Sequence, residues 1–281
     1  METITLNNGV KMPQLGYGVY QVEPAEAERC VSDALSVGYR MVDTAQAYRN
    51  EEGVGAAVKK SGLKRDEVFI VSKVWISNYG YERARASIDD SLKCLQTDYI
   101  DLMLLHQPFC DYYGAYRALE EAYHAGKLRA IGVSNFQPNH LIDLASNVEV
   151  VPAVNQVETH VFYQQICAKK YMDEFDTKIM SWGPLAEGRN GLFTNPTLAE
   201  IGQAHGRSVA QVALRYLTQR GVIIIPKSVR RERMAENFQI YDFKLTPDEM
   251  ARIERLDTAH SLFFDHNDPE TVKMFMGWRS L

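Results

Sequence analysis

Eight short runs of apolar, often β-branched residues recur along the 281-residue chain, and segments with helical spacing separate them. Strands that alternate with helices in this way pair in parallel through right-handed crossovers. Eight such units can close into a (β/α)8 or TIM barrel, an α/β fold whose active sites lie at the carboxyl ends of the strands. The runs that we expect to form the strands are residues 15–19, 40–43, 68–74, 99–105, 128–133, 152–157, 178–182 and 222–225.

An open, doubly wound sheet is the alternative arrangement of the same alternating elements. A sheet of that kind that binds a dinucleotide carries G-x-G-x-x-G at its first strand-to-helix turn. The chain has Gly16 with Gly18 and Gly53 with Gly55, and both pairs lack the third glycine. The missing glycine favours the barrel.

The ends of the expected elements carry residues that favour such ends. Strand-like runs at 4–6 and 10–12 flank an Asn-Gly pair, which predicts a β-hairpin ahead of the barrel. Ser208 is followed three residues later by Gln211, the pattern of a helix capping box. We therefore expect residues 1–281 to form a single barrel domain with a hairpin at its start.

Composition and charge limit the classes of function. The formal charge of −5 and the isoelectric point near 5.8 give no attraction to polyanions, so we expect no nucleic-acid partner. The N-terminus is acidic and no apolar run approaches the roughly 18 residues of a membrane span, which predicts a cytoplasmic protein without a membrane partner. Neither a metal nor a disulfide is expected, because the cysteines lack suitable spacing: Cys30, Cys94, Cys110 and Cys167.

Reactive side chains stand at the ends of consecutive expected strands. Asp43 ends the second strand, Lys73 lies near the end of the third, and His106 directly follows the fourth, while Tyr48 stands in the loop after Asp43. Neighbouring strands lie about 4.8 Å apart, so Asp43 and Lys73 at matching strand ends can form an ion pair that stabilises a desolvated ammonium. The structural alternative is a core ion pair beside a hydrogen-bonded histidine, with no chemistry.

These side-chain types together can supply a proton to a carbonyl oxygen. A tyrosine has an unperturbed pKa of about 10, and a nearby ammonium favours the phenolate and lowers that pKa. We therefore expect Lys73 to tune Tyr48 as a general acid, with Asp43 holding Lys73 in place. A neutral His106 would donate a hydrogen bond to the substrate oxygen and orient it.

Six sequence motifs follow one another along nearly the whole chain. They are Asp43-Thr44-Ala45-x-x-Tyr48-x-Asn50-Glu51, Ser72-Lys73-Val74-Trp75, Leu105-His106, Gly132-Val133-Ser134-Asn135-Phe136, Asn155-Gln156-Val157-Glu158 and Ile225-Pro226-Lys227-Ser228. In this order they resemble the aldo-keto reductase superfamily, and most of all its bacterial 2,5-diketogluconate and glyoxal reductases and its protozoan prostaglandin F synthases. The resemblance implies a (β/α)8 barrel and NADPH-dependent reduction of aldehydes and ketones. It implies the same roles for Tyr48, Lys73, Asp43 and His106 as the residues themselves suggest.

The resemblance also implies where the nicotinamide half of NADPH would bind. Ser134, Asn135 and Gln156 fall where the family hydrogen-bonds the nicotinamide carboxamide. Trp182 falls where an aromatic ring stacks on the nicotinamide, and its flat face suits that contact. The residues that follow in the same implied segment are Gly183, Pro184 and Leu185.

A second implied cofactor segment follows the eighth expected strand. Lys227, Ser228 and Arg233 resemble the family's clamp for the adenosine 2′-phosphate, and loops after strands seven and eight are the usual phosphate site of this fold. This clamp favours NADPH over NADH. The arginines at 230 and 231 are better interpreted as a solvated helix start. The remaining residues implied near the nucleotide are Val229, Glu236 and Asn237.

Aromatic residues near these positions are candidates for the substrate pocket, with an aromatic core cluster as the alternative. In the family a C-terminal tail sets substrate choice, and the last 25 residues of this chain are rich in aromatic side chains. The candidates are Tyr20, Trp75, His106 and Phe109, with Phe263, Phe264 and Trp278 as further ones from the tail.

Three residues need separate interpretation. Gln107 stands where many relatives have a tryptophan after the histidine, which leaves the local pocket surface open. His160 lacks the proline that often follows it in relatives, and a structural role is the better interpretation. Cys110 lies just past His106, where lining a pocket is a better interpretation than nucleophilic catalysis.

Two other classes of function remain open for the sequence. A nucleotide-binding sensor or regulatory subunit with negligible turnover would keep the same cofactor residues. A metal-dependent barrel hydrolase would need clustered His and Asp ligands at strand ends, which the sequence lacks. The physiological substrate is left open, with small aldehydes as the first choice, and a monomer is expected.

Overall fold

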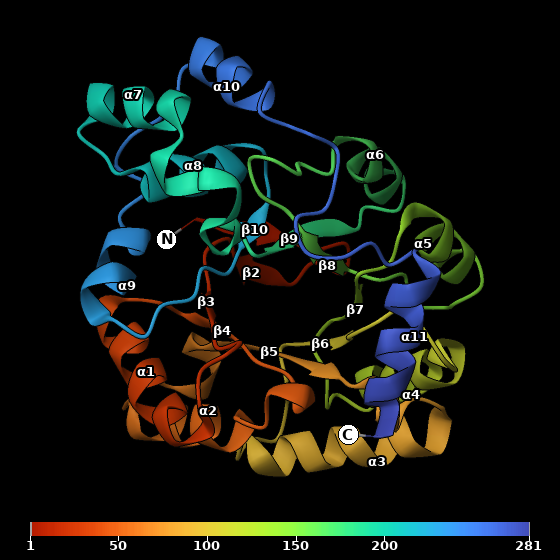
Figure 1. The fold of residues 1–281 in the computed structure, drawn as a ribbon. Coiled ribbons are helices and arrows are strands. Elements are labelled where there is room, and N and C mark those ends of the chain that lie inside the picture. The colour runs from red at the N-terminus through yellow and green to blue at the C-terminus, as the bar shows by residue number, and fades with distance from the viewer. Residues whose placement is uncertain (1, 281) are drawn as a thin grey trace.

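The structure is a computed structural model that describes residues 2–280, and eight parallel strands with helices around them form its centre (Figure 1). All eight strands expected from the sequence are present, although most are shorter than their apolar runs. Within this sheet, strands that are consecutive along the chain are hydrogen-bonded neighbours. They are β3 (Tyr17–Gly18), β4 (Met41–Asp43), β5 (Phe69–Val74), β6 (Leu102–Leu105), β7 (Ile131–Ser134), β8 (Val154–Glu158), β9 (Lys178–Trp182) and β10 (Ile223–Ile224).

The two edge strands of this sheet meet and close the barrel. Leu15, just before β3, forms a parallel bridge with Ile224, and the amide of Gly16 donates to the carbonyl of Ile224 over 2.8 Å. A Cβ atom at Gly18 would lie 2.9 Å from the carbonyl oxygen of Ile225, closer than side-chain carbons approach a backbone. Glycine is therefore needed where these strands meet, and the closed barrel is confirmed over the open sheet.

Helices lie outside the ring of strands (Figure 1). The capping box expected at Ser208 and Gln211 is formed at the start of α8. Within residues 2–280, none of the helices is long and apolar enough to cross a bilayer. The α-helices are α1 (Pro24–Val37), α2 (Glu51–Lys60), α3 (Tyr81–Cys94), α4 (Tyr112–His124), α5 (Pro138–Ala145), α6 (Ile166–Glu174), α7 (Pro196–His205), α8 (Val209–Gln219), α9 (Arg231–Phe238), α10 (Pro247–Glu254) and α11 (Pro269–Gly277). The 3-10 helices are η1 (Gln46–Tyr48), η2 (Arg65–Glu67), η3 (Ile76–Asn78), η4 (Ala186–Thr194) and η5 (Trp278–Ser280).

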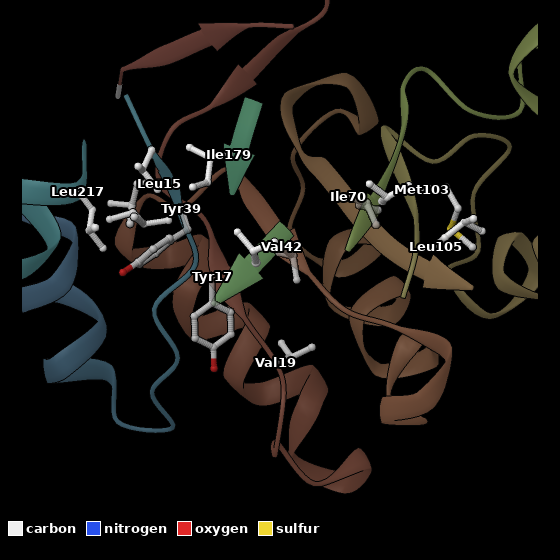
Figure 2. Packing of buried hydrophobic residues seen from close by; sticks show 14 of the residues in the cluster. Leu15, Tyr17, Val19, Tyr39, Val42, Ile70, Met103, Leu105, Ile179 and Leu217 are labelled. Atoms are coloured by element: carbon white, nitrogen blue, oxygen red, sulfur yellow. The ribbon is translucent and has the colours of Figure 1, made fainter. Parts of the chain in front are cut away.

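Side chains along each strand alternate between the barrel interior and the side that faces the helices, as the period of two requires. Two clusters of buried hydrophobic residues follow from this alternation. The interior cluster, inside the ring of strands, includes Phe69 and Val71 of β5. The outer cluster, between the strands and the helices, includes Ile70 (Figure 2). Continuing the same alternation turns Lys73 inward, and the alternation along β4 turns Asp43 inward as well. The two charged residues therefore face each other at the carboxyl end of the barrel interior.

The outer cluster also holds the loop after β10 in place. Tyr17 and Tyr39 are buried within it, with ring centroids 5.9 Å apart (Figure 2). The hydroxyl of Tyr17 donates to the carbonyl of Ser228 over 2.6 Å. This bond ties the first strand of the barrel to the connection between β10 and α9.

The N-terminal hairpin closes the opposite end of the barrel. Its strands β1 (Thr3–Thr5) and β2 (Lys11–Pro13) are each displaced by one residue from the expected runs. Leu6 and Met12 are buried in the interior cluster, and the Asn8 side chain donates to the carbonyl of Arg129 over 2.9 Å. Because the hairpin covers the end of the barrel where the strands begin, a functional site can form only at the end where they finish.

Candidate active site

An ion pair between Lys73 and Asp43 lies at the centre of the candidate site. Lys73 Nζ is 2.7 Å from Asp43 Oδ1, and the two side chains are 0% and 2% exposed. In the sheet, Asp43 of β4 pairs with Val71 of β5, and Lys73 lies two residues further along β5. The long side chain of Lys73 extends back along the strand to reach the carboxylate of Asp43. The expected pair is thus confirmed, although the strand ends do not match. Burial lowers the pKa of Lys73, and the carboxylate of Asp43 opposes that change.

Both partners of this ion pair have further hydrogen bonds. Lys73 Nζ also donates to the carbonyl of Thr44 over 2.8 Å. Gln156, from β8, donates from Nε2 to the other carboxylate oxygen of Asp43 over 2.8 Å. A buried ion pair needs such additional bonds to offset the loss of solvation. The pair is therefore held in one geometry from three strands.

Tyr48 stands over the ion pair at the end of η1. Its hydroxyl oxygen is 3.4 Å from Lys73 Nζ. The turn that carries it is fixed by Gln46, whose Oε1 accepts from the backbone N–H of Trp75 over 3.0 Å. Tyr48 as a whole is half-buried, and its hydroxyl group is the buried part.

The pKa of Tyr48 moves in the opposite direction to the one we expected. Burial raises this pKa well above its ordinary value, and the negative charge of Asp43 adds to the rise. The expected net lowering of the Tyr48 pKa is therefore wrong, because the lost solvation of the phenolate outweighs the ammonium of Lys73 3.4 Å away, which on its own still favours the phenolate. Tyr48 consequently keeps its proton throughout the neutral pH range.

His106 is the first residue after β6, and its ring lies against those of Tyr48 and Trp75. Its ring centroid lies 5.6 Å from that of Tyr48 and 5.0 Å from that of Trp75. Burial, with the Lys73 ammonium as the next cause, holds the pKa of His106 well below its ordinary value. The imidazole is therefore neutral near pH 7. Its Nδ1 is enclosed and has no hydrogen-bond partner among the residues that the structure describes.

The ends of β7, β8 and β9 supply a second group of polar side chains. Trp182 donates from Nε1 to Asn135 Oδ1 over 2.8 Å, and Asn135 donates from Nδ2 to the carbonyl of His106 over 3.1 Å. Asn135 has a left-handed backbone with φ of 64°, which asparagine tolerates better than most residues. Ser134 donates to the carbonyl of Gln156 over 2.8 Å. Four residues expected in one cofactor segment are thus brought together beside the first group.

A cavity of about 350 Å³ opens next to Trp182. Asn135, Glu158 and the tail segment 259–267 are among the residues that line it. Gly183 and Leu185 are half-buried nearby in the chain, and Pro184 is buried. The cavity therefore adjoins the ring that we expected to carry a nicotinamide.

The residues expected to clamp a phosphate form a separate, exposed segment after β10. Lys227 and Arg233 are exposed, and neither has an ion-pair partner among residues 2–280. Ser228 is half-buried and held through its carbonyl by Tyr17. Further residues of the segment differ in burial, with Val229 exposed, Glu236 half-buried and Asn237 buried. The positive charge next to the start of α9 suits an anionic group.

The aromatic candidates for the substrate pocket divide into two sets. Tyr20 is 53% exposed and lies against Tyr48 with ring centroids 5.1 Å apart, and Trp75 lies against His106. Phe109 packs instead in a cluster with two tail residues, His266 and Phe275. Phe263 and Phe264 contact Trp182 at centroid distances of 5.2 and 6.0 Å, and Trp278 packs on Phe275 at the outer end of the tail.

Sequence reasoning missed the residues that dock the tail. Glu158, at the end of β8, accepts from the backbone N–H of Leu262 over 2.8 Å and also binds Ser261. His266 lies 3.0 Å from Gln107 through its Nε2 and the glutamine Oε1. Gln107 carried a signal, since it departs from the family pattern, whereas no local pattern marks His266 or Phe275.

Two residues singled out for their chemical type have structural partners. Both ring nitrogens of His160 are engaged, Nε2 with Glu158 at 2.9 Å and Nδ1 as acceptor for the backbone N–H of Tyr163 at 3.0 Å. Cys110 Sγ contacts Met276 Sδ at 3.8 Å. Among the described residues there is no cluster of three or more metal-ligating side chains.

The fold and this site together define a (β/α)8 enzyme-type barrel with a Tyr-Lys-Asp-His group at its mouth. The aldo/keto reductase family model matches residues 8–258. The chain belongs to the aldo/keto reductase family and is an oxidoreductase. This confirms the resemblance stated from the motifs.

Individual relatives are similar along most of their length. The chain is 46% identical to the glyoxal reductase of Bacillus subtilis, over 91% of this chain and 93% of that protein. It is 43% identical to the 9,11-endoperoxide prostaglandin H2 reductase of Trypanosoma cruzi, over 90% and 91% of the two chains. Among solved structures, an aldo-keto reductase from Bombyx mori in complex with NADP matches with a TM-score of 0.89 and 30% identity, covering 97% of this chain and 96% of that one.

Proposed function

We propose that the protein reduces aldehydes and ketones to alcohols with NADPH as the cofactor and Tyr48 as the proton donor. The observation that carries the proposal is the contact between the Tyr48 hydroxyl and Lys73 Nζ at 3.4 Å, with Asp43 bound behind the lysine and a neutral His106 beside the phenol. Reduction of a carbonyl group to an alcohol requires a general acid that protonates the oxygen, and a hydrogen-bond donor that orients the oxygen assists it. Tyr48 and His106 would supply these two groups.

Each residue then has a distinct part in the reaction. Tyr48, whose raised pKa keeps it protonated, gives its proton to the carbonyl oxygen. The Lys73 ammonium stabilises the phenolate that remains, and Asp43 holds Lys73 within reach of it. His106 has Nδ1 enclosed, so an N–H on Nε2 is the group it can offer to the substrate oxygen.

The residues present fit NADPH. Bound there, the cofactor would supply the hydride that reduces the carbonyl carbon. Trp182 offers a half-exposed aromatic face beside the cavity, and Ser134, Asn135 and Gln156 place hydroxyl and amide groups around it. Lys227 and Arg233 are exposed cations that would hold the adenosine 2′-phosphate, and neither forms an ion pair within residues 2–280. The Bombyx mori relative in complex with NADP supports this choice of cofactor.

Replacing Tyr48 with phenylalanine tests the proposal. The variant should keep its affinity for NADPH and lose about 10²- to 10⁴-fold in turnover, because only the proton donor is removed. The assay follows NADPH consumption with methylglyoxal, a nitrobenzaldehyde and a keto-sugar acid. Tyr81→Phe is the matched control, since that hydroxyl binds Glu121 on the outer surface. Unchanged turnover in Tyr48→Phe would rule out this proton donor, and no turnover in the unmodified protein would favour a nucleotide sensor.

Small aldehydes are the substrates that we propose first, and the identity with a glyoxal reductase supports them. We also propose a cytoplasmic monomer. The four cysteines are unpaired thiols, which suits a reducing compartment.

A further inference from the structure

His266 of the C-terminal tail is buried against the carboxyl end of the barrel. It is 5% exposed, and its ring stacks on Phe275 with centroids 5.6 Å apart and lies 6.0 Å from Phe109. Its Nε2 is 3.0 Å from Oε1 of Gln107, a residue 159 positions earlier in the chain. Because Gln107 directly follows His106, the tail contacts the rim of the candidate active site at this point.

The direction of each hydrogen bond around Gln107 follows from chemistry. The indole N–H of Trp182 only donates, so the Asn135 atom that it meets at 2.8 Å is the carbonyl oxygen. The amide nitrogen of Asn135 then donates to the carbonyl of His106 at 3.1 Å and to Gln107 at 3.3 Å. Gln107 must accept with Oε1, and His266 must therefore donate from Nε2.

We propose that His266 is a positioning residue for the Trp182 ring, acting through Gln107 and Asn135. With both donors in place, the glutamine carbonyl has one orientation, and Asn135 in turn holds the indole. Without the histidine donor, the Gln107 carbonyl loses the shorter of the two hydrogen bonds that hold it, and the remaining 3.3 Å bond from Asn135 fixes it less firmly. The C-terminal tail thereby stabilises the hydrogen bonds that hold the Trp182 ring beside the cavity. Only the effect on NADPH binding rests on the proposed function.

A route through packing runs parallel to this relay and has to be separated from it. Phe264 lies 5.2 Å from the ring of His266 and 6.0 Å from that of Trp182. Two substitutions divide the routes. His266→Phe keeps an aromatic ring in the stack and removes the donor, whereas His266→Gln removes the ring and keeps an N–H donor near the position of Nε2.

The first test uses the protein without cofactor, labelled with ¹⁵N, and follows the indole N–H resonances of its three tryptophans by NMR. Trp182→Phe identifies the resonance of Trp182. In His266→Phe that resonance should move and its N–H should exchange faster with solvent, whereas His266→Gln should leave both unchanged. The relay is overturned if His266→Phe leaves the resonance in place, or if both variants change it equally.

The second test measures the dissociation constant of NADPH for the same proteins. Loss of one hydrogen bond in the relay should weaken binding roughly 3- to 10-fold in His266→Phe, and His266→Gln should stay within about twofold. Equal affinities in His266→Phe and the unmodified protein overturn the positioning role. If the unmodified protein does not bind NADPH, the proposed function fails, and the NMR result still decides whether the relay exists.

Discussion

Replacing Lys73 with methionine should destabilise the protein strongly, because the Asp43 carboxylate would stay buried without its cation. The two side chains are 0% and 2% exposed and only 2.7 Å apart. Removing one partner of a buried pair costs about 3–5 kcal/mol. Gln156 would still donate to the carboxylate from 2.8 Å, so we expect a loss near the lower limit, about 3 kcal/mol in the free energy of unfolding.

Urea unfolding at pH 7 measures this loss from the transition midpoint and slope. Lys273→Met is the matched control, because its ion pair with Glu270 is 72% and 76% exposed and its removal should cost at most about 0.5 kcal/mol. The double variant Asp43→Asn/Lys73→Met should recover much of the stability, since no unpaired charge is left inside. If Lys73→Met loses no more than the control, or the double variant loses more than the single one, the reasoning about an uncompensated charge is refuted.

Three further outcomes follow from the structure. Lys227→Ala should raise the dissociation constant for NADPH about tenfold and leave that for NADH within twofold. Lys244→Ala is the control, because Lys244 is also exposed. An equal loss of affinity for NADPH and NADH in Lys227→Ala would contradict a contact with the 2′-phosphate. Burial lowers the pKa of His266 to about 4, so the contribution of neutral His266 to the free energy of unfolding is present above about pH 6.5 and is lost as the pH falls toward 4. In urea titrations between these pH values, the free energy of unfolding of His266→Phe should fall less steeply than that of the unmodified protein, by about 1.4 kcal/mol per pH unit. Identical slopes for the two proteins would contradict this prediction. Gly18→Ala should cost about 1–3 kcal/mol because the added Cβ would meet a backbone oxygen. Gly277→Ala should cost far less in the same assay, because the space that its added Cβ would occupy is open.

The type and order of the elements could be read from the sequence because they depend on local patterns. Alternating apolar runs and helical spacing predicted all eight strands, and the hairpin and the capping box at Ser208 followed from short motifs. The strand-end rule then placed Asp43, Lys73 and His106 on one rim. Parallel strands of a barrel turn their ends and their inward side chains to the same place, so local positions were sufficient to predict that these residues would meet.

The sign of the Tyr48 pKa shift depended on the tertiary structure. The sequence showed an ammonium near a phenol, which by itself lowers the pKa. How much solvent the phenol loses depends on the segments that cover it, and here that loss dominates. Glu51 gives a similar lesson. Nothing in the local sequence marks Glu51 as buried, yet its carboxylate is buried and accepts from the hydroxyl of Ser72 over 2.5 Å.

The tail also depended on the tertiary structure. Its aromatic residues were visible in the sequence, but nothing local showed that His266 would meet Gln107 or that Glu158 would bind the backbone of Leu262. Such contacts join segments more than 100 residues apart, and their partners are chosen by the shape of the barrel mouth. The sequence alone therefore determined which reactive groups line the rim, because strand periodicity is a local property. Tertiary structure decided how those groups are solvated and what covers them, because burial is set by contacts between distant parts of the chain.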